Sequence, residues 1–345
     1  MRLLICLATA LGLLAAPPVI NELQPRGAQK GRPFSLTIAG QNLGEGVRIL
    51  SAMPATFTPM APPAGMAEGR YATFLVEPKS ELEVGVYPIR VQTADGLSNI
   101  LLFSVGAFPE INEEESQPGG MAHSNDSIEK AQSLPSTAIT LNGTLRGAER
   151  DVYRLQVKAG ERRVFEVDAR RAGSAIDPVI RVMDGNGKQI AGSEDAPLLQ
   201  LDPRLDMTFP TAGYYYVEIH DARFSGQAQN FYRLKTGAYS YPTEVFPLGG
   251  QRGKQVEVSL GAGKVTADLT KSRGPQAFVN LPDSPALPLP LAVGEFPEVS
   301  EPVTGPLTLP LTVNGRLAKA AEIDKYRLAV TPGEEYIFEL QAPQL

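Results

Sequence analysis

Oxygen-bearing side chains gather in the stretch "INEEESQPGGMAHSNDS" at residues 111–127. Calcium prefers clustered oxygens from carboxylates, amides and carbonyls, which such a stretch supplies across a glycine-containing loop. We therefore expect calcium as the cofactor and no other. An alternative stays open, in which Asp126 is a helix N-cap with Glu129 three residues on and the glutamates form a solvated linker. The expected calcium ligands are Glu113, Glu114, Glu115, Asn125 and Asp126.

Other acidic groups are weaker metal candidates. Asp184 and Asn186 in "MDGNGKQ" resemble a fragment of a calcium loop, but the dipeptides favour a hairpin turn. The remaining weak candidates are Asp195, Asp202 and Asp206.

Catalytic groups are scarce. The chain has two histidines, His123 and His220, with no zinc-binding helix pattern and no Gly-x-Ser-x-Gly elbow. We interpret His220 as a strand-end residue. The glycine-rich "GGQRGKQVEV" leads into a strand pattern, whereas a phosphate-binding loop needs a helix. The sequence therefore predicts no catalytic residue and no enzyme within this chain.

The tyrosine-rich run "GYYYVEIHD" alternates between two faces. Tyr215, Val217 and Ile219 share one face, and Tyr214 and Tyr216 share the other. One tyrosine pair could be exposed to a glycan, but the chain has no tryptophan. Packing is therefore the favoured role of these rings.

The N-terminus and the charge limit where the chain works. One arginine precedes about a dozen apolar residues, which is typical of a secretory signal peptide and too short for a membrane span of roughly 20 residues. We expect an extracytoplasmic protein with no membrane span in the mature chain. Cys6 is the only cysteine, so disulfides are not expected. The balance of 32 basic and 38 acidic residues, without a basic patch, makes nucleic acid an unexpected partner.

Short alternating runs dominate the remaining sequence. Runs such as "RRVFEVDA" and "KQVEVSLG" have a period of two and are separated by turn residues about every ten positions. This pattern predicts an all-β chain of tandem antiparallel β-sandwiches.

One phrase occurs twice, as "DVYRLQVKAG" at 151–160 and "DKYRLAVTPG" at 324–333. The match extends over 142–169 and 314–342 with one inserted residue. Both copies are expected to form the same strand–turn–strand. Upstream, "VGAFPEINE" at 105–113 returns as "VGEFPEVSE" at 293–301, and "NELQPRGAQKG" at 21–31 returns as "TEVFPLGGQRG" at 243–253.

The repeats divide the chain into alternating modules of two kinds. We expect a signal peptide at 1–16, an immunoglobulin-like β-sandwich at 17–107, an acidic linker at 108–127, a second β-sandwich at 128–237, a shortened copy of the first module at 238–294, and an incomplete copy of the second at 295–345.

Two family resemblances follow from these motifs. Residues 122–237, through "NGTLRGAERDVYRLQVKAGERRVFEVDA" and "DPRLDMTFPTAGYYYVEIHD", resemble the bacterial pre-peptidase C-terminal domain. The resemblance implies a non-catalytic, jelly-roll-like sandwich attached to secreted proteins, often hydrolases, with some relatives binding calcium or a polymeric substrate. Residues 17–107 more loosely resemble the immunoglobulin-like fold of plexins and transcription factors, through "PPVINELQPRGAQKGRPFSLTIAGQNLG".

We therefore expect an exported, non-catalytic protein that serves as a binding, adhesion or spacer module at the cell envelope or outside the cell. Its expected partner is an extracellular polymer, either polysaccharide or protein, or a downstream catalytic domain. The alternative is the N-terminal accessory region of a secreted hydrolase, such as a peptidase, with its catalytic domain beyond residue 345. A third interpretation, an unrecognised enzyme, requires a deep polar cleft with converging carboxylates.

Overall fold

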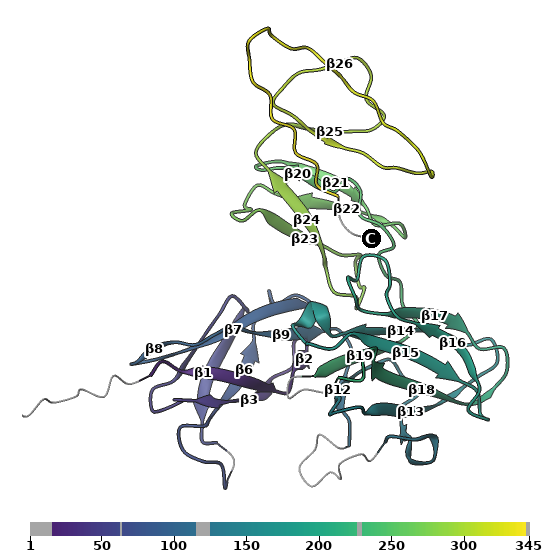
Figure 1. The fold of residues 1–345 in the computed structure, drawn as a ribbon. Helices are drawn as coiled ribbons and strands as arrows, with labels where there is room; N and C mark the ends of the chain where they lie inside the picture. Colours follow the sequence, from purple (N-terminus) through teal and green to yellow (C-terminus); the bar gives the residue numbers. More distant parts are fainter. Residues whose placement is uncertain (1–15, 63, 115–124, 226–229, 343–345) are drawn as a thin grey trace, which may run out of the picture. The chain divides into compact units, whose positions relative to one another are not determined.

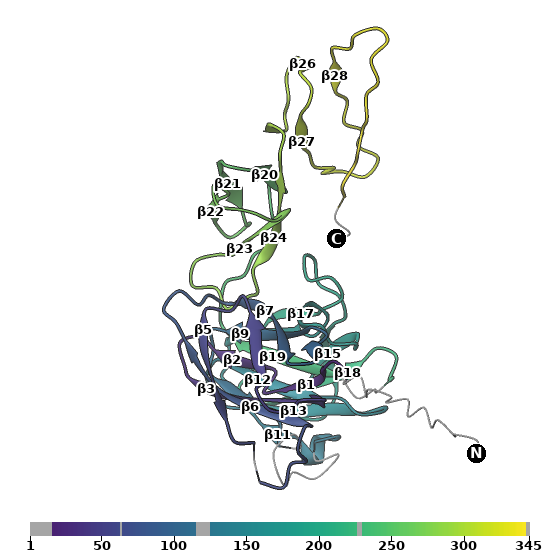
Figure 2. The ribbon, with the colours of Figure 1, turned by 90° about the vertical axis from the view of Figure 1, so that its left-hand side faces the viewer.

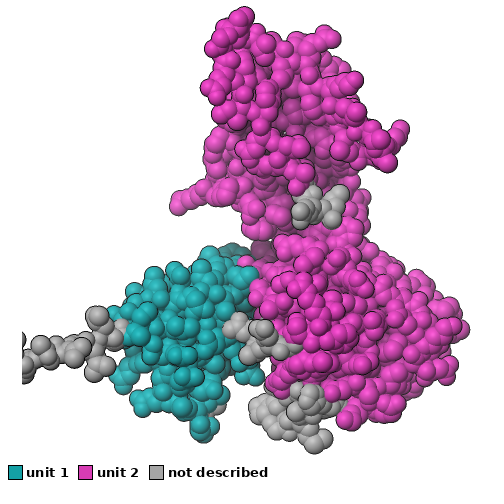
Figure 3. Space-filling view, in the orientation of Figure 1, with its two compact units in different colours: residues 1–26, 31–82, 87–103 teal, residues 27–30, 83–86, 104–345 magenta. Residues whose placement is uncertain are grey.

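A computed structural model describes residues 16–62, 64–114, 125–225 and 230–342. The expected signal peptide therefore lies outside the described residues, apart from its last position. The chain divides into two compact units, which Figure 3 shows in teal and magenta: residues 1–26, 31–82 and 87–103, and residues 27–30, 83–86 and 104–345.

The first module is a β-sandwich with one sheet in the order β1-β3-β6-β5 and another in the order β2-β9-β7-β4, with β8 paired to β7. Its inward residues alternate along each strand, as in β3, where Leu36 and Ile38 are fully buried. The strands are β1 (Val19–Gln24), β2 (Gly27–Gln29), β3 (Phe34–Gln41), β4 (Arg48–Ser51), β5 (Ala55–Met60), β6 (Tyr71–Pro78), β7 (Gly85–Thr93), β8 (Gly96–Leu97) and β9 (Leu101–Gly106).

The second sandwich has two five-stranded sheets, ordered β10-β12-β19-β14-β17 and β11-β13-β18-β15-β16 (Figure 1). Most pairs are antiparallel, but β10 with β12 and β11 with β13 are parallel. Its elements are β10 (Glu110–Asn112), η1 (Ile128–Lys130), β11 (Gln132–Ser133), β12 (Ile139–Thr144), β13 (Arg150–Val157), β14 (Arg162–Asp168), η2 (Arg170–Ala172), β15 (Pro178–Met183), β16 (Gln189–Ser193), β17 (Arg204–Thr208), β18 (Gly213–Asp221) and β19 (Phe231–Gly237).

The core of the second sandwich lies between its sheets and follows the predicted alternation. Tyr153, Leu155 and Val157 of β13 point inward and meet Phe165 and Val167 of β14. Each such side chain contributes roughly 1.5–3 kcal/mol through burial. The all-β fold of tandem sandwiches is thus confirmed.

The segment expected to be an acidic linker, 108–127, contributes to the second sandwich. Its first part forms β10, which pairs in parallel with β12. Its last part is also held, because the backbone N–H of Val152 donates to the carbonyl of Asn125 at 2.8 Å. The sandwich therefore begins about twenty residues before the expected boundary at residue 128, since "PEIN" supplies an edge strand.

The third module has a three-stranded sheet, β20-β24-β23, and the pair β21-β22. Val258, Leu269 and Leu291 are among the residues of its small core. The strands are β20 (Gly249–Gln251), β21 (Gln255–Ser259), β22 (Lys264–Asp268), β23 (Gln276–Val279) and β24 (Leu289–Gly294).

The last part of the described chain has only short strands in two parallel pairs, β25-β27 and β26-β28 (Figures 1 and 2). Residues 335–341, which match β14 in sequence, form no strand. The expectation of one strand–turn–strand in both copies is therefore wrong for its second strand, because among the described residues no strand takes the places that β17 and β19 have beside β14. The strands are β25 (Glu298–Ser300), β26 (Pro306–Leu307), β27 (Thr312–Asn314) and β28 (Arg327–Leu328).

Within the part of the chain that the structure describes, we find no helix with the length and apolar character needed to cross a membrane.

Candidate metal centre

Three carboxylates converge at one end of the second sandwich. One carboxylate oxygen each from Asp126, Glu149 and Asp151 lies within 4.8 Å of the others. Glu149 is 5% exposed and Asp151 is 1% exposed, so the cluster is largely removed from water. Buried like charges repel each other strongly, which favours a bound cation.

Strand β13 positions two of these side chains. Glu149 lies immediately before the strand and Asp151 is its second residue, so the two share a face by the alternation of a β-strand. That face continues into the core through Tyr153. Antiparallel pairing of β13 with β18, in which Asp151 lies opposite Ile219, fixes the register.

The remaining polar groups arrive from the segment before η1 and from the residue after β10. Asn125, 1% exposed, is tied to β13 through the bond from Val152, which brings Asp126 next to Asp151. Glu113 is also 1% exposed, and its Oε1 accepts from the backbone N–H of Thr144 at 2.9 Å.

Two buried tyrosines form the floor of the cluster. The hydroxyl of Tyr232 donates to Asp151 Oδ2 at 2.5 Å and is hydrogen-bonded to the hydroxyl of Tyr153. The Tyr153 hydroxyl also lies 3.5 Å from Glu113 Oε2. Burial raises the pKa of both tyrosines well above the usual value, and the charges of Asp151 and Glu113 raise it further. Both hydroxyls therefore stay protonated and act as donors that orient the carboxylates.

The cluster has room for a calcium ion. Calcium–oxygen distances are about 2.3–2.6 Å, so ligands on opposite sides of the ion lie roughly 5 Å apart. The observed limit of 4.8 Å fits this spacing.

The expected ligand set is only partly brought together. Glu113, Asn125 and Asp126 lie in or beside the cluster, whereas Glu114 is exposed and meets Gln132 through its backbone N–H. Glu114 follows Glu113 directly, and adjacent residues of an extended segment point to opposite sides. Glu115 lies outside the described residues.

Sequence reasoning missed Glu149 and Asp151. A signal for them was present, because the repeat pairs Asp151 with Asp324 and each aspartate has a glutamate two positions earlier, Glu149 and Glu322. Alternation on a strand places each such pair on one face.

The last module repeats part of this cluster. Asp324 has its pKa raised by burial and by the charges of Glu301 and Glu322, which correspond to Glu113 and Glu149. The segment between Glu298 and Asn314 is 16 residues shorter than that between Glu110 and Asn142 and has no Asn-Asp pair. The acidic group of the last module therefore contains the strand and linker carboxylates. It has no counterpart of the Asn-Asp pair that lies beside Asp151 in the second sandwich.

A second buried acidic cluster in the same sandwich is already neutralised. Glu166, Asp168 and Asp202 are fully buried and contact three cations. The interatomic distances are 2.7 Å from Lys235 to Glu166, 2.6 Å from Arg204 to Glu166, 2.7 Å from Arg171 to Asp168 and 2.9 Å from Arg171 to Asp202. Because three acids meet three bases, this cluster needs no metal ion, and Asp202 is not a ligand candidate.

The other polar candidates have structural partners. His220 is the penultimate residue of β18, 2% exposed, and its Nδ1 lies 3.2 Å from Glu218 Oε1. Asp184 Oδ1 accepts from the backbone N–H groups of Asn186 and Lys188, which confirms the hairpin turn. Asp206 pairs with Arg162 at 2.6 Å.

Tyr214 is 52% exposed beneath the guanidinium of Arg154, whereas Tyr215 is 6% exposed in the core. One face of the tyrosine-rich strand is therefore exposed and the other is buried, as the alternation of its sequence indicates.

Comparison with solved structures finds similar β folds. The pre-peptidase C-terminal domain of collagenase from Bacillus anthracis is 16% identical, covers 33% of this chain and 100% of that chain, and gives a TM-score of 0.27. The extracellular region of plexin A4 is 9% identical over 73% of this chain and 18% of that chain, with a TM-score of 0.22. SGBP-B of the Bacteroides ovatus mixed-linkage glucan utilization locus is 10% identical over 61% of this chain and 71% of that chain, with a TM-score of 0.20.

A pre-peptidase C-terminal domain and a plexin, the two families that the sequence resembles, are among the structures found. No family model matches the chain, and no curated protein sequence matches it.

Proposed function

We propose that this chain is an extracytoplasmic, non-catalytic binding or spacer module whose second sandwich is stabilised by one calcium ion. The observation that carries the metal assignment is the convergence of Asp126, Glu149 and Asp151 within 4.8 Å. Glu113 and Asn125 supply further oxygens beside them. The calcium assignment thus keeps three of the five expected ligands and adds two.

The ion would have a mechanical role. It would neutralise carboxylates held close together and tie the segment at Asn125–Asp126 to β13. That segment precedes η1 and β11, which forms the edge of one sheet of the sandwich. Calcium would thereby hold the edge of the sandwich closed, as suits a domain that binds or spaces in a calcium-containing medium outside the cytoplasm.

A calcium titration of the full chain tests the assignment. Extracellular calcium modules bind with Kd values of about 0.1–1 mM, so roughly 10 mM calcium is a ten- to hundredfold excess. Binding to the folded state alone then adds about 1.4–2.7 kcal/mol of stability. Thermal unfolding of the chain in calcium and in chelator measures this gain. Spectroscopic signals from residues of β13 and η1 report the unfolding of the second sandwich.

Matched variants locate the ion. Asp126→Asn and Glu149→Gln are expected to remove the calcium-dependent gain, and in chelator both variants should be as stable as the parent or more so, because a like-charge repulsion is relieved. Glu114→Gln removes an expected ligand that lies outside the cluster, so it should keep the full gain. Equal unfolding midpoints with and without calcium in the parent chain would remove the metal assignment.

The partner of the proposed binding module is an extracellular polymer, either polysaccharide or protein. Export is supported by the leader-like N-terminus, and the lack of catalytic function by the missing nucleophile and metal-protease patterns in the sequence. Cell fractionation of the native host protein tests the location. Recovery in the cytoplasm with an uncleaved N-terminus would contradict it.

A further inference from the structure

Two short segments carry the chain from a module of the first kind into a module of the second kind. The first is "VGAFPEINE" at 105–113, and the second is "VGEFPEVSE" at 293–301. Each begins in the last residues of a strand, β9 or β24, and continues through β10 or β25. These two segments are the joints of the chain.

The start of each joint is bonded to a strand of the preceding module. β2 pairs in parallel with β9, and β20 pairs in parallel with β24 in the same register. The Gln29 side chain donates to the carbonyl of Ala107 at 3.3 Å. Likewise, the Gln251 side chain donates to the carbonyl of Glu295 at 3.1 Å. The backbone N–H of the residue after each glutamine donates to the carbonyl of the joint's glycine, at 2.8 Å in the first joint and 2.7 Å in the second.

The end of each joint is bonded to a strand of the following module. β10 pairs in parallel with β12, and β25 pairs in parallel with β27 in the same register. Asn142 donates to Glu110 Oε2 at 2.9 Å. Asn314 donates to Glu298 Oε2 at 2.8 Å. The carbonyl of the joint's proline accepts from a threonine N–H at 2.9 Å in both joints. The same groups meet at the same positions, so the repeat includes the connection as well as the modules.

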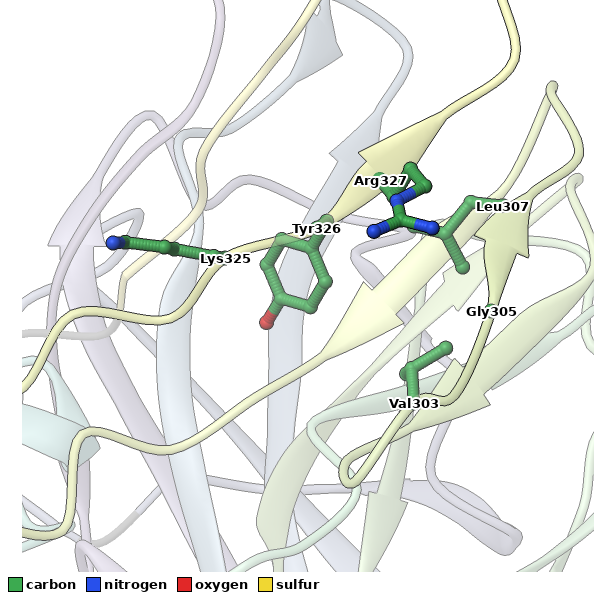
Figure 4. Close-up of a pocket in the computed structure, with 6 residues that line it drawn as sticks. All are labelled: Val303, Gly305, Leu307, Lys325, Tyr326 and Arg327. Carbon is green, nitrogen blue, oxygen red and sulfur yellow. The ribbon is translucent and has the colours of Figure 1, made fainter.

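The glutamate that ends each joint also has matching partners. Glu113 and Glu301 each accept a hydrogen bond at 2.9 Å from the backbone N–H two residues after the asparagine that bonds the joint. The hydroxyl of Tyr153 lies 3.5 Å from Glu113 Oε2, and Tyr326 donates to Glu301. Figure 4 shows the hydroxyl of Tyr326 pointing away from Arg327. Each joint is therefore bonded from its glycine to its last glutamate.

Little of either joint is left free to bend. A single residue, Phe108 or Phe296, stands between the part bonded to the preceding module and the part bonded to the following one. Each phenylalanine precedes a proline, whose ring fixes its own φ and confines the residue before it to extended backbone. A hinge needs residues that absorb large changes in φ and ψ, and neither joint has them.

In the first joint, a side chain of the second sandwich also contacts β2. The guanidinium of Arg233 is 1% exposed and donates to Glu110 Oε1. It lies against Gly27, because a Cβ there would come within 2.4 Å of Arg233 Cζ. Residues 27–30 and 104–345 accordingly belong to one compact unit. Glycine is therefore required at residue 27 by a side chain of β19.

We propose that the two Gly-x-Phe-Pro-Glu segments are rigid joints, so that the chain serves as a spacer and not as modules on flexible tethers. The inference rests on the proposed function and selects the spacer role within it. A free linker loses backbone entropy whenever its modules are held apart, whereas a bonded joint has already lost it. The joints use none of the carboxylates of Asp126, Glu149 and Asp151, so their rigidity does not depend on calcium.

Hydrogen exchange of the full chain tests the joints directly. The amides that donate to joint carbonyls are those of Lys30, Thr140, Arg252 and Thr312. Each should exchange at least about tenfold more slowly than in an unstructured peptide of the same sequence, because a bonded amide exchanges only when the local structure opens. Exchange at the unstructured rate at either joint, with the neighbouring strands still protected, would overturn the proposal.

Energy transfer between two dyes measures the mechanical effect. Cys6 is the only cysteine, so in a chain with Cys6→Ser the dyes can be attached at Thr58→Cys in β5 and Gln189→Cys in β16, two exposed positions. The parent should give one narrow distance distribution, and inserting Gly-Ser-Gly after Ala107 should widen it. The same insertion after Asn186, in a hairpin turn, is the matched control and should leave the width unchanged. Equal widths for the parent and the joint insertion would overturn the proposal.

A single methyl group tests the contact at Gly27. Gly27→Ala should raise hydrogen exchange of the β12 and β19 amides at least about threefold, because the added Cβ displaces Arg233. Gly44→Ala is the matched control, since its Cβ would meet open space. Unchanged exchange in Gly27→Ala would overturn the first joint. Loss of the calcium-dependent gain, with the joint results intact, would instead remove the metal assignment and leave the joints in place.

Discussion

The second sandwich and the last module contain matching residues in different surroundings. Phe165 is fully buried, whereas its counterpart Phe338 is 70% exposed. Leu145 is 1% exposed, whereas Leu317 is 70% exposed. Yet the polar contacts near the start of each copy agree, as in the bonds from Asn142 to Glu110 and from Asn314 to Glu298.

This difference shows which strands form through contacts with nearby sequence and which require strands that are distant in sequence. Strand pairs whose partners lie within about thirty residues form in both copies. The strand at 162–168 forms only where β17 and β19 flank it. Strand propensity largely reflects packing against neighbours, so the same pattern stays irregular when the neighbours are absent.

The largest expected contrast lies in the buried ion network. Glu166→Gln leaves Lys235, Arg171 and Arg204 without their shared carboxylate, and breaking a buried pair in this way costs about 3–5 kcal/mol. The matching Glu339→Gln changes an exposed residue and should stay within about 0.5 kcal/mol. Hydrogen exchange of the β14 and β19 amides in the full chain measures the first variant, and exchange of the β27 amides in the last module measures the second.

The same carboxylate predicts an acid transition. Burial opposes the charged form of Glu166, but Lys235, Arg171 and Arg204 together hold its pKa below the usual value. Because the folded-state pKa is lowered, its contribution is complete above the unfolded value of about 4.3 and is lost as pH falls toward the folded value. An unchanged acid limb in Glu166→Gln would contradict this account.

A smaller contrast is expected at the paired tyrosines. Tyr153→Phe removes a hydroxyl from a buried network with Tyr232 and Glu113 and should cost about 1–2 kcal/mol. Tyr326→Phe removes an exposed hydroxyl and should cost less than about 0.5 kcal/mol. Urea unfolding of the two single variants compares them. Equal costs would mean that the last module is as closed as the second sandwich.

The smallest effect concerns the titration of Tyr326. Its hydrogen bond to Glu301, with burial and the charge of Glu301, raises the pKa of Tyr326 to about 12. Because the folded pKa is raised, the contact stabilises fully below the unfolded value of about 10 and is lost as pH rises toward 12. Glu301→Gln should bring the pKa back toward about 10. Ultraviolet difference titration against Tyr326→Phe measures it, and an unchanged pKa would show that Glu301 is not the cause.

Much of the fold follows from alternation along the chain. The inward set Tyr153, Leu155 and Val157 could be assigned because a strand turns every second side chain toward the core. The same rule predicts an exposed Glu166, which is instead fully buried. The outer face of β14 is covered from outside the local pattern, since Arg204 reaches Pro242 and stacks on Tyr241. Such cover depends on chain far away in sequence.

The candidate metal site shows the same limit. Glu113, Asn125 and Asp126 could be proposed from one oxygen-rich stretch. Glu149 and Asp151 join them only through the position of β13, which is set by its pairing with β18 more than fifty residues later. The composition of the oxygen-rich stretch could indicate calcium. The register of β13 against β18 determines which further carboxylates, Glu149 and Asp151, join the candidate site.

The pairing of β12 with β19 also has a consequence for folding during synthesis. Asn142 and Arg233 are 91 residues apart, and a ribosome adds about 5–20 residues per second. For roughly 5–20 s of synthesis, the first half of the second sandwich therefore exists without the strand that covers it. In that interval its tyrosine and its strand edge lack the cover of β19, much as Tyr326 is exposed and β27 pairs only with β25 among the described residues. The last module thus resembles the nascent sandwich before its final strand arrives, the stage at which the chain most needs protection from aggregation and premature pairing.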